Sequence, residues 1–228
     1  MDIQESTIKF PSQDAELSAF LARPQAPGPF PGLVVIHEIF GLTEHIKDIT
    51  RRLACEGYAA LAVDLFWQRN LKLCMLQAIA IFAGGGTEHF GTRGLRSGLD
   101  YLAQQDFVDA ERLGAVGFCM GGNFALGLAL HDKRVKAIAP FYGVNPWRLK
   151  DFSGFCPVVA SFPEDDILTK KDGPQLEAAL TRYKIPHDVK IYPGARHSFM
   201  DPRRPKAYHP EAAADAWSRT LSFFKEQL

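Results

Sequence analysis

Residues 113–130 constrain the fold of this chain most, because they join a strand to a helix through one sharp turn. Residues 113–116 are continuously apolar, and residues 124–130 are apolar and helix-forming. Between them lies Gly117-Phe118-Cys119-Met120-Gly121. The glycines allow a tight turn, because a Cβ there would crowd the neighbouring strand and helix. Such a turn lifts the Cys119 side chain off the carboxyl end of the strand, where open α/β sheets place their ligands.

The rest of the chain continues this alternation of strands and helices. A hairpin is predicted at residues 3–10 and 16–23, followed by a Pro/Gly-rich loop over 24–31. Further predicted strands cover 32–37, 58–65, 135–142, 157–162 and 187–192, and further helices cover 46–56, 72–83, 92–105, 173–184 and 210–228. This pattern predicts an α/β-hydrolase fold, with a mostly parallel sheet of about eight strands and helices on both faces. We expect residues 1–228 to form one domain.

Composition excludes several classes of function. The 228 residues carry 26 basic and 26 acidic side chains, and no basic stripe indicates nucleic acid or a membrane surface. No apolar stretch is long enough to span a membrane, and the first residues do not resemble a signal peptide. The four cysteines lack metal-ligand or redox-pair spacing. We therefore expect a cytoplasmic monomer that acts on a small molecule and uses no metal or cofactor.

A thiol on such a turn needs a base, because the thiolate is the nucleophile and a free thiol is mostly protonated at neutral pH. In α/β-hydrolases the nucleophile, the acid and the histidine follow in that order along the chain. His197 lies in a loop after the last strand and is the predicted base. The acid is expected after the strand at 157–162, where Glu164, Asp165 and Asp166 are adjacent. Asp165 is our first choice, and Asp166 and Glu164 are the alternatives.

The residues that would stabilise an oxyanion follow from the same placement. The backbone N–H of Met120, directly after the thiol, is one expected donor, and Ile39 after the strand at 32–37 supplies the other. Glu38 is unusual beside a thiol nucleophile. Its carboxylate either raises the pKa of the thiol by like-charge repulsion or hydrogen-bonds to the neutral thiol. Alternatively, it only provides a charge at a helix N-terminus.

Three motifs together resemble one enzyme family, the dienelactone hydrolases or carboxymethylenebutenolidases. They are HEIFGL at residues 37–42, GFCMGG at 117–122 and HSF at 197–199. The resemblance implies an α/β-hydrolase fold, a Cys-His-Asp triad and no cofactor. It also implies opening of unsaturated five-membered lactones to maleylacetate-type acids during catechol breakdown. In this family the residue matching Glu38 holds the resting thiol neutral, and substrate binding displaces it so that it can take the thiol proton.

Substrates of this family carry a carboxylate, which arginine binds well because its planar fork matches both oxygens. The resemblance points to Arg69 as one such residue, although a solvated loop charge is an equal alternative. The family position for a second arginine holds Asp201 here. Either Arg203 replaces it or this contact is lost, which would favour a broader carboxylesterase or another lactonase. A scaffold that only binds a ligand is the remaining alternative.

Overall fold

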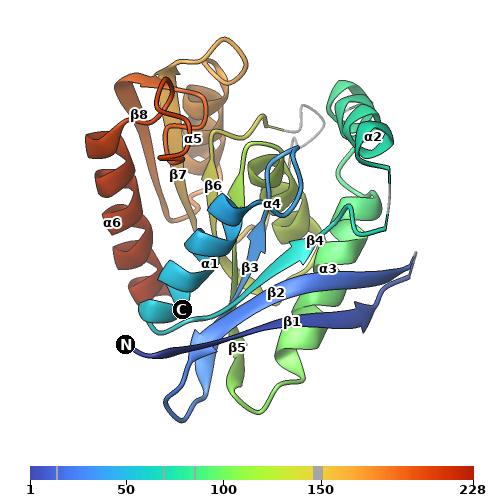
Figure 1. The fold of residues 1–228 in the computed structure, drawn as a ribbon. Coiled ribbons are helices and arrows are strands. Elements are labelled where there is room, and N and C mark those ends of the chain that lie inside the picture. The colour runs from blue at the N-terminus through green and yellow to red at the C-terminus, as the bar shows by residue number, and fades with distance from the viewer. Residues whose placement is uncertain (14, 69, 85, 146–150) are drawn as a thin grey trace.

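The computed structural model describes residues 1–13, 15–68, 70–84, 86–145 and 151–228 (Figure 1). Its eight-stranded sheet has the order β1-β2-β4-β3-β5-β6-β7-β8. β1 pairs with β2, and β2 with β4, in antiparallel register, while the remaining neighbours are parallel. The strands are β1 (Ile3–Pro11), β2 (Glu16–Pro24), β3 (Phe30–Ile36), β4 (Ala59–Asp64), β5 (Val108–Phe118), β6 (Val135–Phe141), β7 (Val158–Asp165) and β8 (His187–Arg196). The predicted α/β-hydrolase sheet and its N-terminal hairpin are confirmed.

Helices cover both faces of this sheet. They are α1 (Glu44–Cys55), α2 (Leu71–Gly84), α3 (Phe90–Ala103), α4 (Met120–His131), α5 (Asp172–Arg182) and α6 (Pro210–Gln227). Helices α1 and α6 pack in one hydrophobic cluster, and α3, α4 and α5 pack in the other. Figure 1 shows α1 and α6 in front of the sheet, with α3 and α4 behind it.

The two clusters follow from the alternation of side chains along a strand. In β3, Leu33 and Val35 face α1 and α6, while Val34 and Ile36 face the opposite helices. All four side chains are buried. A strand covered on both faces is therefore a continuous apolar run, and this run is why β3 could be predicted from the sequence.

Two strands begin earlier than the sequence predicts. β3 starts at Phe30 inside the expected loop, and β5 starts at Val108 rather than residue 113. These added residues pair with each other, since Phe30 is the partner of Val108 in the parallel register. The first part of β5 is polar and partly exposed, so no apolar run marks it.

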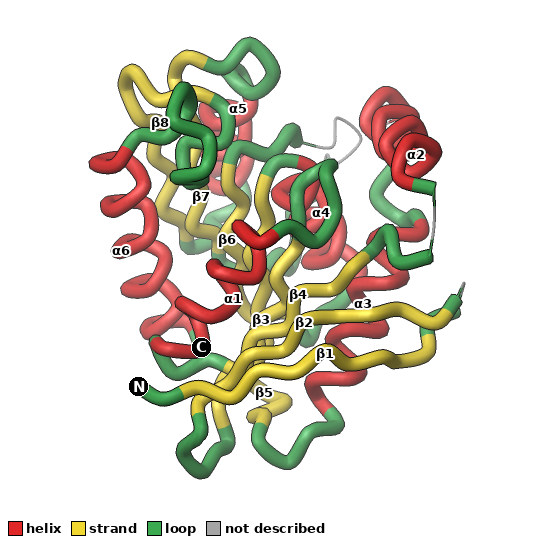
Figure 2. Tube along the Cα trace, viewed as in Figure 1, coloured by secondary structure: helices red, strands yellow, loops and turns green. Residues whose placement is uncertain are grey.

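The parallel strands bring the ends of several segments to one edge of the sheet. The turns that leave the carboxyl ends of β3, β5, β6 and β7 lie along this edge (Figure 2). They begin with His37, Cys119, Tyr142 and Asp166. The fold thus gathers side chains from distant parts of the sequence around Cys119.

Candidate active site

Cys119 lies on the predicted sharp turn between β5 and α4. Its backbone has φ 55° and ψ −116°, a conformation that costs a non-glycine residue energy. A Cβ on Gly117 would lie 2.0 Å from the carbonyl oxygen of Gly121, and one on Gly121 would lie 2.3 Å from that of Ile36. Neither contact is possible for a real side chain, so this turn requires both glycines. The Cys119 side chain is only partly buried, as a reactive thiol needs.

His197 connects Cys119 to a carboxylate. Its Nδ1 lies 2.6 Å from Oδ2 of Asp166, and the Cys119 thiol is the other group that interacts with its ring. A carboxylate only accepts, so Nδ1–H donates and the other ring nitrogen is left to Cys119. Burial lowers the pKa of His197, but the interactions with Asp166 and Cys119 outweigh it and raise the pKa to about 10.

The choice of Asp165 as the partner of His197 is wrong. Asp165 is exposed at the last position of β7, where it pairs in register with Arg196. Asp166 follows the strand and turns inward, so it is buried while its neighbours are not. Glu164, the third alternative, is exposed and accepts a hydrogen bond from the backbone N–H of Gly194 at 3.3 Å. Adjacent residues of a strand point to opposite faces, so the three carboxylates cannot all face His197. The turn after β7 decides which of them reaches the histidine.

Asp166 is held by three donors. Besides His197, Thr169 Oγ1 donates to Oδ2 at 2.6 Å and the backbone N–H of Leu168 donates to Oδ1 at 3.0 Å. Burial raises the pKa of this carboxyl, but the bonds from His197 and Thr169 prevail and the pKa lies below its usual value. Asp166 therefore stays charged and fixes the ring orientation of His197.

Glu38 is a second buried carboxylate at this edge, with 1% of its surface exposed. Ser198 Oγ donates to its Oε1 at 3.1 Å, and Arg204 Nη2 donates to its Oε2 at 3.3 Å. Burial raises the pKa of Glu38, and the charge of Arg204 opposes this effect without cancelling it. Among the described residues these are its hydrogen-bond partners, so Glu38 is not bonded to the Cys119 thiol in this conformation.

His37 fixes the backbone that carries Glu38 and Ile39. Its Nε2 accepts the backbone N–H of Leu65 at 3.2 Å, so Nδ1 carries the proton and donates to the carbonyl oxygen of Glu38 at 2.6 Å. This ties the turn after β3 to the turn after β4. Ile39 follows in that turn, and Met120 is the first residue of α4, whose N–H has no partner within the helix. The two predicted oxyanion donors thus border the same edge as Cys119.

The arginines differ from the expectation. Arg203, the predicted carboxylate-binding residue, hydrogen-bonds to Asp48 on the exposed side of α1 and does not enter the site. Arg204 takes its place, since it contacts Glu38 and lies 4.7 Å from the Phe40 ring. Asp201 is buried and holds Arg204 Nε at 3.3 Å. Arg69 lies outside the described residues.

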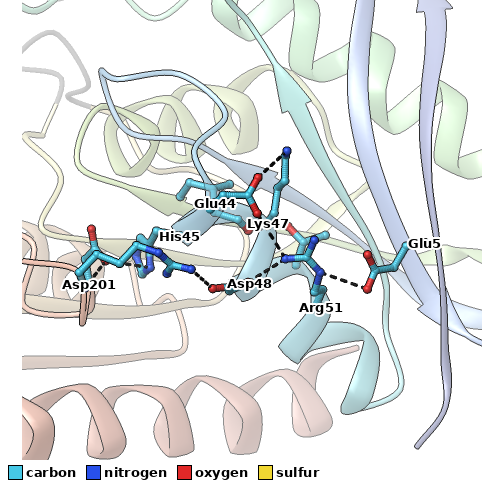
Figure 3. A network of polar contacts seen from close by, with 10 residues as sticks. Glu5, Glu44, His45, Lys47, Asp48, Arg51 and Asp201 are labelled. Carbon is cyan, nitrogen blue, oxygen red and sulfur yellow. Dashed lines mark hydrogen bonds and ion pairs between the residues drawn. The ribbon is translucent and has the colours of Figure 1, made fainter.

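Asp201 also connects the site to a polar network along α1. His45 Nδ1 lies 3.6 Å from Asp201 Oδ1. Figure 3 shows this network running from Asp201 and His45 through Asp48 to Arg51 and Glu5. From the sequence, Asp201 was only a departure from the family pattern. Its contact with Arg204 forms when the turn after β8 folds, and no local sequence pattern predicts it.

Comparisons with known proteins identify the family of this chain. The sequence model of the dienelactone hydrolase family matches residues 17–228, and the chain belongs to this family. A Synechocystis protein named "putative carboxymethylenebutenolidase" is 32% identical, with 100% of this chain and 99% of that protein covered. A protein of the same name from Saccharolobus solfataricus is 31% identical, with 97% and 98% covered. The chain is therefore a carboxylic ester hydrolase that acts on esters or lactones.

Solved structures show the same fold. A dienelactone hydrolase-like promiscuous phosphotriesterase from metagenomic libraries superposes with a TM-score of 0.86 at 26% identity, with 100% of this chain and 99% of that chain covered. An esterase from Pyrobaculum calidifontis superposes with a TM-score of 0.78 at 16% identity, covering 98% and 85%. The second likeness concerns the fold alone.

Among the described residues, no three His, Cys, Asp or Glu side chains gather as a metal site would require. No helix in those parts of the chain is both long and apolar enough to cross a membrane.

Proposed function

We propose that this enzyme opens an anionic unsaturated lactone, converting a dienelactone to a maleylacetate-type acid in the breakdown of catechols. Support comes from one arrangement above all, in which His197 hydrogen-bonds to Asp166 and interacts with the Cys119 thiol. This is the order of nucleophile, base and orienting carboxylate that acyl transfer requires.

The proposed reaction has two halves. The Cys119 thiolate attacks the lactone carbonyl, and the N–H groups of Ile39 and Met120 hold the oxyanion. A carbon–sulfur bond forms and the ring carbon–oxygen bond breaks, so that the leaving oxygen departs as an enolate and takes up a proton. Acylation removes the Cys119 charge that helps to raise the pKa of His197, so the ring can then act as a base. His197, oriented by Asp166, removes a proton from water, which hydrolyses the thioester and restores the thiol.

Arg204 is the proposed partner of the substrate carboxylate. Its side chain is 37% exposed, so a ligand can reach it, while the side chain of Glu38 beside it is buried. A substrate carboxylate that binds Arg204 takes the place of the Glu38 carboxylate as its anionic partner. Glu38 is then free to turn toward Cys119, and its raised pKa suits a group that takes up the thiol proton.

A comparison of substrates tests this function. We expect kcat/KM for a dienelactone to exceed that for a neutral aryl ester of similar leaving group by about tenfold or more, since a charged hydrogen bond is worth about 1.5–3 kcal/mol. Equal values for both substrates would reject the anionic lactone as the preferred substrate.

A broader carboxylesterase or other lactonase is the second candidate. It is favoured by Arg203, which is paired with Asp48 and leaves Arg204 as the cation beside Glu38 in the described part of the chain. The name of the metagenomic relative also records a promiscuous activity on this scaffold. Equal rates on neutral and anionic substrates in the same experiment would support it.

A further inference from the structure

Tyr142 lies in the candidate site without a role in the mechanism above. It follows β6 directly, with φ 40°, a left-handed conformation that disfavours a side chain as large as tyrosine. Its backbone N–H donates to the carbonyl oxygen of Ser161 at 2.9 Å, which secures it to β7. The ring packs against the His197 imidazole, with centroids 5.0 Å apart, and against Phe199 at 5.4 Å.

The hydroxyl of Tyr142 is buried and has no hydrogen-bond partner within the described part of the chain. The whole residue is inaccessible, with 0% of its surface exposed. Burying an unpaired hydroxyl destabilises a fold, and a phenylalanine would avoid this cost. A strained backbone together with an unpaired buried donor is typical of a site that is completed in another state of the protein.

The groups around this hydroxyl identify its acceptor. Burial, followed by the charges of Glu38, Cys119 and Asp201, raises the pKa of Tyr142, while Arg204 opposes them. The hydroxyl therefore remains a donor at any working pH. Asp201 already binds Arg204 and the backbone N–H of Arg203, and the His197 ring already interacts with Asp166 and Cys119. Glu38 is the buried carboxylate whose partner Arg204 the substrate would take.

We propose that Tyr142 is a positioning residue whose hydroxyl donates to the Glu38 carboxylate once substrate has claimed Arg204. The hydrogen bond would hold Glu38 in a second position, toward Cys119, where it accepts the thiol proton. This inference rests on the proposed roles of Cys119, Glu38 and Arg204. It explains why a donor without a partner in the present conformation is kept beside the triad.

A double-mutant cycle tests the proposal with Tyr142→Phe, Glu38→Gln and the combined variant. We expect Tyr142→Phe alone to lower kcat for a dienelactone by about tenfold with KM nearly unchanged, because the bond forms only after substrate has bound. In the Glu38→Gln background the same change is expected to have no further effect, since its acceptor carboxylate is gone. Tyr58→Phe, a buried tyrosine packed against Phe224 at the other end of the sheet, is the matched control.

The outcomes separate this inference from the proposed function. An unchanged kcat in Tyr142→Phe, or an equal loss in both backgrounds, would overturn the inference. An unchanged kcat in Glu38→Gln alone would reject the role of Glu38 itself. The melting temperature gives an independent check, because Tyr142→Phe is expected to melt at the wild-type temperature or above. A clear decrease, beyond that of Tyr58→Phe, would mean that the hydroxyl is already bonded in the resting enzyme and would also overturn the proposal.

Discussion

Two buried carboxylates at the same edge of the sheet, Asp166 and Glu38, have pKa values shifted in opposite directions. Asp166 receives three hydrogen bonds of 2.6, 2.6 and 3.0 Å, which keep its pKa below the usual value. Glu38 receives two longer ones, and burial raises its pKa. One carboxylate is thus fixed in its charged form, while the other can gain or lose a proton. Such a separation of pKa values is how a single site assigns different tasks to similar groups.

The difference also concerns rigidity. The Asp166 side is built from one turn, since Asp166, Leu168 and Thr169 are neighbours in sequence. The Glu38 side depends on residues that are more than 150 positions away, Ser198 and Arg204. Arg204 is partly exposed and can exchange one anionic partner for another. This difference supports the proposal that Cys119, His197 and Asp166 are arranged before substrate binds and that the substrate is recognised on the Glu38 side.

The largest predicted effect removes the thiol that both carboxylates serve. Cys119→Ala is expected to lower kcat for any ester or lactone by at least about 10³-fold, because no acyl-enzyme can form. Steady-state hydrolysis of a dienelactone and an aryl ester measures it. Cys55→Ala, at the exposed end of α1, is the control and should keep full activity. Substantial turnover by Cys119→Ala would end the assignment of the nucleophile.

The next prediction concerns the fixed carboxylate. Asp166→Asn is expected to lower kcat by about 10²–10⁴-fold, since His197 loses both its orientation and the charge that stabilises the imidazolium. Asp165→Asn is the matched control, because this neighbouring carboxylate is exposed and should leave kcat unchanged. The reverse ranking of the two variants would show that the orienting carboxylate had been misassigned.

A smaller effect is expected for Arg204, the partner of Glu38. Arg204→Ala should lower kcat/KM for an anionic lactone by about 10–100-fold, because a hydrogen bond to a charged group is worth about 1.5–3 kcal/mol. The value for a neutral ester should change much less, so the ratio of the two is the measurement. Arg203→Ala serves as control, since this side chain pairs with Asp48 on the surface. A loss of equal size for both substrates would argue against carboxylate recognition by Arg204.

The smallest effect concerns stability. The pKa of Glu38 is raised above its ordinary value of 4.5 in the folded protein, so its contribution to stability is fully present below pH 4.5 and is lost as pH rises through the folded pKa. Asp166 has the opposite sign, since its pKa is lowered and its contribution is present above its ordinary value of 3.8. We therefore expect Glu38→Gln to be slightly more stable than wild type at pH 8, and Asp166→Asn to be less stable. Urea unfolding at pH 8 measures both, and a loss in each variant would contradict the contrast.

The sequence by itself determined the sheet, the turn that presents Cys119, and the place of His197. These depend on local patterns. Strands buried on both faces appear as apolar runs, and the turn at Cys119 has two glycines that no other residue can replace. The order of the motifs along the chain was enough to bring them to one edge, because parallel strands end at the same side of a sheet. The family resemblance rests on the same local segments.

Only the tertiary structure decided which charged residue of each cluster enters the site. Asp165 and Asp166 are adjacent, as are Arg203 and Arg204, and their composition does not distinguish them. One residue of each pair faces inward because a strand ends or a turn reverses at that point. Asp166 thereby lies 2.6 Å from His197, and Arg204 lies 3.3 Å from Glu38. The unpaired hydroxyl of Tyr142 is likewise a property of packing, since the rings around this residue, Phe118, Phe141, His197 and Phe199, come from separate segments. Local sequence fixes where the chain turns, whereas the side chains that meet across the site depend on contacts between distant segments.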